Sequence, residues 1–168
     1  FQTGEKGSQD IAAFMITGAG NYTSNHWRQH AIGIGIDYLS GDSDPGDSDY
    51  KVFDTLFATN HKFYGFMDYF VNIPVDTDQG GLLDIALKTG MKLTPQTKLD
   101  LHLHHFSLAE GGEKALGQEI DAVLSYARNP AAQIQWGASL FLPGDAMEAL
   151  RGSGDPALKA YWQTTVSF

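Results

Sequence analysis

Hydrophobic and polar residues alternate at every second position along most of this chain. The clearest case is KLDLHLH at residues 98–104, in which three leucines share one face while Asp100, His102 and His104 share the other. A period of two is expected of β-strands whose two faces meet different surroundings. The pattern predicts about seven strands, the first of them ambiguous because both its faces are apolar, at residues 11–22, 32–38, 83–93, 98–104, 119–126, 134–142 and 161–168.

The connections between these predicted strands alternate between short and long. The short ones are rich in turn-forming residues such as Pro, Asn and Thr. Outer-membrane β-barrels sort their connections in this way, with short turns inside and long loops outside, whereas a soluble sandwich or barrel has no reason to do so. The short connections are 23–26, 94–97 and 129–130, and the long ones are 41–80, 109–115 and 143–158.

The composition is compatible with a barrel wall. Hydrophobic residues make up 42% of the 168 residues and charged residues only 18%, yet no run approaches the roughly 20 apolar residues that a membrane helix requires. The net charge of −9 argues against nucleic acid as a partner, because phosphates attract a basic surface. Cysteine is absent, which excludes thiol chemistry, and no cofactor is expected.

We therefore predict an all-β fold, an antiparallel transmembrane β-barrel segment spanning residues 1–168 with a long extracellular loop at 41–80. Single-chain bacterial barrels have even strand numbers from 8 upward, and an open sheet cannot span a bilayer. Seven strands would thus form part of a wall completed by further N-terminal strands or by another chain. The polar start at Gln2–Gly7 favours a chain that begins partway through a larger protein, and an overlooked strand within 50–80 or before residue 11 would instead give eight.

The end of the sequence supplies another signal. Trp162, Val166 and the terminal Phe168 share one face of the last predicted strand. A terminal aromatic residue closing an amphipathic strand resembles the assembly signal of bacterial outer-membrane proteins, and an ordinary edge strand is the alternative. This interpretation predicts outer-membrane lipid and the barrel assembly machinery as partners, a bacterial outer-membrane location, and a C-terminus on the periplasmic side.

Four segments carry a family resemblance. FDTLFATNHKFYGFMD at residues 53–68 resembles a loop of the alginate export family of Gram-negative outer-membrane proteins, and residues 33–42 are similar to the strand that leads into it. Residues 116–121 and the corner at 141–145 also match the family pattern. The resemblance covers about 31–168. It implies the C-terminal portion of a monomeric barrel of about 18 strands, which passes solutes passively and has an anionic polysaccharide as cargo.

The predicted polar faces indicate what a pore would present to solutes. A channel for polyuronate should offer Arg and Lys to the lumen, but these faces are mixed and slightly acidic. We therefore expect an outer-membrane porin or export channel that passes polar solutes or a polysaccharide, and no enzymatic activity. Residues 53–73 are rich in aromatic side chains and are expected to fold into the mouth and narrow it. The expected pore-lining residues are Asp84, Lys88, Lys92, Asp100, His102, His104, Glu119 and Asp121.

Other candidate sites are weaker. His102 and His104 have a spacing that could chelate a transition metal, with Glu119 or Asp121 on the next strand, but a polar lumen lining is the favoured interpretation. The acidic loop lacks the spacing of an EF-hand, so a solvated loop is favoured over calcium binding, and no metal is expected. The outward pair His105 and Ser107 lacks an orienting partner for nucleophilic catalysis. The weak calcium candidates are Asp42, Asp44, Asp47 and Asp49.

Two other classes of protein stay open. One is a soluble β-barrel that binds a small ligand and encloses the Leu and Ile faces in its interior. The other is a structural barrel that encloses or anchors a partner protein.

Overall fold

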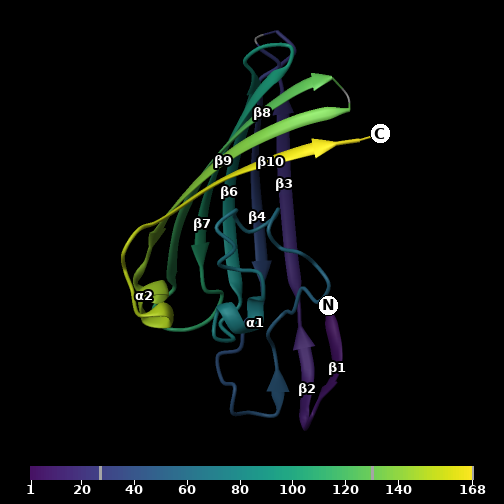
Figure 1. Ribbon diagram of the computed structural model, residues 1–168. Coiled ribbons are helices and arrows are strands. Elements are labelled where there is room, and N and C mark those ends of the chain that lie inside the picture. The colour runs from purple at the N-terminus through teal and green to yellow at the C-terminus, as the bar shows by residue number, and fades with distance from the viewer. Residues whose placement is uncertain (27, 130, 168) are drawn as a thin grey trace.

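An antiparallel sheet dominates the computed structural model, which describes residues 1–26, 28–129 and 131–167. Within these residues, seven strands lie in the order β10-β9-β8-β7-β6-β4-β3 and form a curved wall (Figure 1). The fold is all-β, with 54% of residues in strands and 7% in helices. The strands are β3 (Met15–Thr23), β4 (Ala31–Leu39), β6 (Leu82–Lys92), β7 (Thr97–Ser107), β8 (Ala115–Asn129), β9 (Ala132–Pro143) and β10 (Ala157–Val166).

All seven predicted strands are present, with one correction at the first. The ambiguous segment 11–22 is divided at Phe14, whose backbone bonds Ser40, so that its first residues belong to a different sheet. That small sheet has the order β1-β2-β5, and its strands were not predicted. It adds no eighth strand to the wall within the described residues. Its strands are β1 (Gln2–Lys6), β2 (Gln9–Ala13) and β5 (Asp49–Tyr50).

The lengths of the connections agree with the prediction in part. Those at 93–96 and 130–131 are short, and those at 40–81 and 144–156 are long. The connection at 24–30, predicted as a short turn, has the same length as 108–114, seven residues. The short turns lie at one end of the sheet and the long connections at the other, and β10 runs toward the short-turn end (Figure 1). Helices α1 (Ile73–Asp76) and α2 (Asp145–Arg151) lie in the long connections and were not predicted. In the part of the chain that the structure describes, no pairing joins the edge strands β3 and β10, so the sheet is open.

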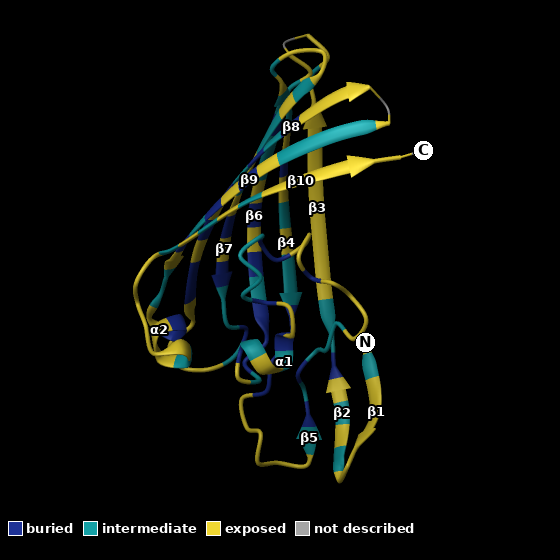
Figure 2. Ribbon diagram, in the orientation of Figure 1, coloured by how far each residue is buried: buried dark blue, intermediate teal, exposed yellow. Residues whose placement is uncertain are grey.

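Burial on the two faces of the sheet is the reverse of that in a soluble protein. The apolar stripes are exposed, and polar side chains on the opposite face are buried, chiefly in the half nearer the long connections (Figure 2). The soluble-barrel alternative expected the Leu and Ile faces to point inward, whereas in the described part of the chain these faces are exposed. None of the helices described here is long and apolar enough to cross a membrane. Exposed apolar residues include Ile34, Ile36, Leu87, Leu103, Ile120, Trp136 and Trp162; buried polar ones include Asp84, His104, Glu119, Asp121, Ser125 and Ser139.

The hydrophobic core lies at the long-connection end, where residues 53–73 fold back over the polar face. Phe70 is 1% exposed, and its ring centroid lies 4.6 Å from that of Phe106 on β7 and 6.4 Å from that of Phe141 on β9. Such aromatic contacts between a connection and the sheet hold the connection in place. The core cluster comprises Leu39, Tyr64, Phe70, Ile73, Leu82, Phe106, Leu116, Phe141, Ala146 and Met147.

We expect Phe70→Ala to release residues 53–73 from the sheet. Removing a buried phenylalanine costs about 3–5 kcal/mol, so hydrogen exchange at the Met67 amide should accelerate by about 100-fold or more. The matched control is Phe57→Ala, because Phe57 is 100% exposed in the same segment. Equal exchange rates in the two variants would contradict this assignment of the core.

Candidate functional site

The eight predicted lining residues occupy one face of three neighbouring strands. The register pairs His104 with Ala86 and Glu119, and pairs His102 with Lys88 and Asp121. Since alternate residues share a face, the other predicted positions on β6 and β7 lie on this same face. The eight residues are not one compact cluster: Asp84, His104, Glu119 and Asp121 are buried, Lys88, Asp100 and His102 are half-buried, and Lys92 is exposed toward the short-turn end.

A hydrogen-bonded pair fixes the centre of this face. His104 Nδ1 lies 2.9 and 3.0 Å from the two carboxylate oxygens of Asp84, and both side chains are almost fully buried. A carboxylate only accepts hydrogen bonds, so Nδ1 carries the proton and donates it. In the neutral imidazole Nε2 is then the unprotonated nitrogen. The ring of Phe106 stacks on His104 at 5.2 Å between centroids. The orientation of His104 is therefore set from two sides.

Residues 65–67 cover this polar face by direct contact. The Met67 amide donates to Glu119 Oε1 at 2.8 Å, and the Phe66 ring lies 5.4 Å from that of His102. Gly65 has a φ of +83°, and a Cβ atom there would lie 2.6 Å from the Glu119 carboxyl group. Glycine is thus required both by the backbone conformation and by the close approach of the carboxyl group.

A lysine on the last strand anchors the same segment. Lys159 Nζ on β10 donates to the Asp68 carboxylate at 2.7 Å and to the Phe66 carbonyl at 2.8 Å, and His61 also pairs with Asp68. Burial alone would raise the pKa of Asp68, but the hydrogen bonds from Lys159 and then His61 outweigh it and lower that pKa. The pair is partly exposed, so its contribution is chiefly positional.

The segment leaves part of the face unfilled. A cavity of about 230 Å³ lies against β3, β4 and β6, and its lining includes Asp37, Asp84, Lys88 and Phe63. Burial, followed by the charges of Asp37 and Asp84, raises the pKa of the nearby Tyr64 hydroxyl, so this group remains a neutral donor over the ordinary pH range. The sheet side of the cavity thus carries charged groups among small residues, and the Phe63 side chain lines it as well.

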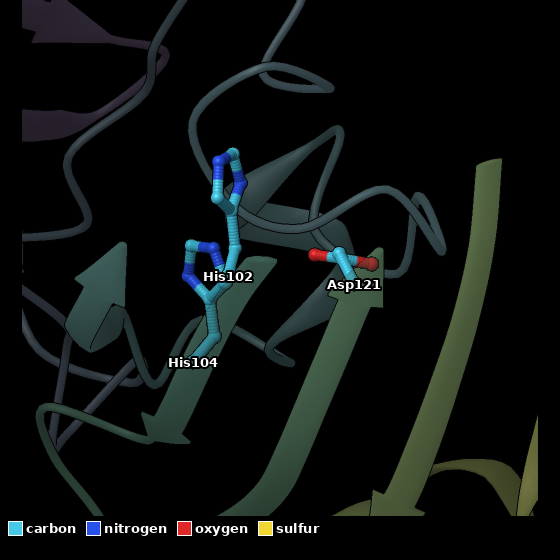
Figure 3. A group of neighbouring side chains, drawn as sticks. All are labelled: His102, His104 and Asp121. Atoms are coloured by element: carbon cyan, nitrogen blue, oxygen red, sulfur yellow. The ribbon is translucent and has the colours of Figure 1, made fainter. Parts of the chain in front are cut away.

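Two buried acids on this face have oxygens without partners. Among the described residues, neither Asp121 carboxylate oxygen has a hydrogen-bond partner, and the same is true of Glu119 Oε2 and of Ser139 Oγ. One potential metal-ligating atom from each of His102, His104 and Asp121 lies within 4.8 Å of the other two (Figure 3). This part of the face is thus rich in hydrogen-bond acceptors and poor in hydrogen-bond donors.

The remaining predicted sites are arranged differently. In the acidic loop, Asp42 and Asp44 accept hydrogen bonds from nearby backbone amides, and Asp47 also pairs with Lys51 at 2.9 Å. Those bonds satisfy the carboxylates locally, and Asp49 likewise lies 3.6 Å from Lys51. These weak calcium candidates therefore have local partners in the residues described, and the interpretation as a solvated loop is kept.

Two further predicted features lie away from the polar face. His105 Nε2 and Ser107 Oγ are 3.4 Å apart on the outer side of β7. Trp162 and Val166 are exposed along β10, whereas Phe168 of the predicted assembly signal lies outside the described residues.

Sequence reasoning missed the residues that join the connection to the face. Lys159 was overlooked because it lies just before the predicted strand 161–168. On β10 it lies on the face opposite to Ala160 and Trp162. Phe66, Met67 and Gly65 belong to a stretch that was expected only to narrow a mouth. No local signal specified that the Met67 amide would meet Glu119, because the two residues are 52 positions apart.

Comparison with known families gave one match. The profile of the family described as Alginate export matches residues 1–159. This is a longer stretch at the N-terminal side than the resemblance over 31–168 suggested. No individual curated protein matches the sequence.

We expect the anchoring of residues 61–68 to depend on pH. The pKa of Asp68 is lowered in the folded state from its ordinary value of 3.8, so its contribution to anchoring is present above that value and is lost as the pH falls through the folded pKa. Because the chain has no cysteine, a label on Ala58→Cys reports on the segment alone. Its fluorescence anisotropy should fall on acidification below about pH 4.

The variant Asp68→Asn should show low anisotropy already at neutral pH and should lose the acid transition. Asp54→Asn removes a carboxylate of the same connection and is the control, expected to keep the transition. An unchanged acid transition in Asp68→Asn would show that another group holds the segment.

Proposed function

Because the chain belongs to the alginate export family, we propose that it forms part of the wall of an outer-membrane β-barrel through which polar solutes pass. The observation that carries the proposal is the reversed burial of the sheet, with Ile, Leu and Trp exposed on one face and several acids and His104 buried on the other. A lipid-facing outer surface and a polar interior would account for both faces.

The open edges of the sheet fit such a wall only if further strands complete it. In a bilayer each backbone N–H and C=O group needs a partner, so β3 and β10 could not remain as free edges. Additional strands of the same protein, or of a second chain, would pair with them. With short turns and the end of β10 at one end of the sheet, we place that end in the periplasm and the long connections outside.

The charges on the polar face favour a channel without strong preference for anions. Lys159 is already paired with Asp68, which leaves Lys88 as a half-buried cation near the centre of the face. The acids Asp84, Glu119 and Asp121 are buried close by. A low-dielectric wall strengthens the attraction of cations by these groups. Polar solutes, including uncharged saccharides, are therefore our preferred cargo over a polyuronate, and we assign no catalytic step.

The membrane assignment is tested by Leu103→Arg. Leu103 is 45% exposed on the outer face of β7, so a soluble protein would tolerate the charge, whereas a lipid-facing site would lose about 2–4 kcal/mol near the bilayer midplane. The expected result is a marked loss of the heat-modifiable folded band on gels of the membrane fraction. The control Val75→Arg alters an apolar residue that is 72% exposed in α1 and should leave the band unchanged. Equal folding of both variants, recovered without detergent, would refute the assignment.

Transport is tested with the full protein in planar bilayers. Under a KCl gradient the reversal potential should indicate a modest preference for cations, because the buried acids Asp84, Glu119 and Asp121 outnumber the half-buried Lys88 at the centre of the polar face. Deleting residues 53–73 should raise the single-channel conductance, since that segment covers the face. The absence of channels in wild-type protein that shows a heat-modifiable band would contradict passage, and unchanged conductance after the deletion would contradict the covering role.

A further inference from the structure

We propose that His102, His104 and Asp121 form a binding site for a divalent transition-metal ion of the zinc class. The two histidines are two residues apart on β7, and Asp121 lies directly opposite His102 in the register with β8. Their donor atoms lie within 4.8 Å of one another. Figure 3 shows the two imidazole rings and the carboxylate extending from adjacent strands into the same space.

The Asp121 carboxylate provides an independent reason for a cation at this place. Asp121 is 1% exposed, and within the described chain neither of its oxygens has a hydrogen-bond partner. A close ionisable neighbour is the buried carboxyl of Glu119, so two acids meet here and are stabilised either by a proton shared between them or by a compensating cation. Lys159 Nζ on β10, two strands away from β8, is directed to Asp68 and the Phe66 carbonyl instead. A metal ion would supply the missing positive charge.

The surroundings of His104 are those of a metal ligand. Its Nδ1 atom donates to the Asp84 carboxylate at 2.9 Å, which fixes the tautomer that leaves Nε2 free to bind a metal. Hydrogen bonding of a ligating histidine to a carboxylate orients the ring and raises its basicity. Asp84 is therefore a positioning residue, and it does not itself contact the ion.

The donor types select the class of ion. Two imidazole nitrogens and one carboxylate oxygen suit zinc and neighbouring transition metals, whereas Ca²⁺ and Mg²⁺ prefer a shell of oxygens. Zinc–nitrogen distances of about 2.0–2.1 Å place ligand atoms about 3.4 Å apart, so the side chains would draw together by about 1 Å on binding. His102 is half-buried and contacts the Phe66 ring, so its movement would also shift that contact. Three protein ligands leave a fourth position for water.

The site also bears on the proposed function, although its existence does not depend on it. A divalent cation at Asp121 would offset the excess of acids on the polar face next to the segment 65–67. If the face lines a passage, bound metal should shift its selectivity toward anions. Metal binding is measured apart from transport, so failure of one leaves the other standing.

The test is titration of the full, untagged protein with Zn²⁺, and with Co²⁺ as a spectroscopic probe. Wild-type protein should bind one equivalent of Zn²⁺, and bound Co²⁺ should show the visible absorption of a low-coordinate nitrogen–oxygen site. Asp84→Asn should weaken Zn²⁺ binding by about 10- to 100-fold. His102→Ala and Asp121→Asn should weaken it more than that. His105→Ala removes an exposed histidine from the opposite face of β7 and should bind as the wild type does.

Asp121→Asn keeps the shape of the side chain and removes a buried charge, so it is expected to fold. Zn²⁺ should raise the melting temperature of the wild type and of His105→Ala but not that of Asp121→Asn. Absence of stoichiometric Zn²⁺ binding in the wild type would overturn the proposal. So would binding that survives both His102→Ala and Asp121→Asn in correctly folded protein.

Discussion

The contact between residues 63–70 and the polar face of the sheet is the constraint on which the rest of the structure depends. Aromatic side chains of this segment pack on Phe106 and Phe141, and its backbone donates to Glu119. Without the segment, a row of acids and histidines and the rings between them would lie open on a concave surface. With it, the same groups are buried and must be satisfied by one another, by the segment or by a bound ion.

This constraint explains why polar side chains are buried beside the hydrophobic core. Each strand carries one apolar and one polar face, and the segment covers the polar one, so the apolar face remains outside. In water an exposed stripe of this size would promote association, whereas a bilayer would satisfy it. The edge strands β3 and β10 would need further strands in such an environment, because hydrocarbon tolerates no unpaired backbone.

Positive and negative charges are distributed unevenly along the polar face. Near β10, Lys159 neutralises Asp68 and caps a carbonyl, and near β6 His104 is paired with Asp84. Between these two pairs, Glu119 and Asp121 keep oxygens for which the described residues provide no partner. A register that aligns β7 with β8 places both acids opposite histidines. The deficit of positive charge is thus local. It lies next to His104, whose ring is oriented by Asp84 and Phe106.

The sequence by itself determined the strands, most of the connection lengths and the shared face of the eight polar residues, because alternation and turn chemistry are local properties. The family resemblance was likewise visible in the sequence, because it rests on contiguous motifs. Only the tertiary structure decided that the aromatic segment covers the centre of the polar face, that Lys159 meets Asp68, and that Asp121 joins the two histidines. These contacts join residues up to 93 positions apart, and no local pattern encodes the register or the backbone path that brings them together.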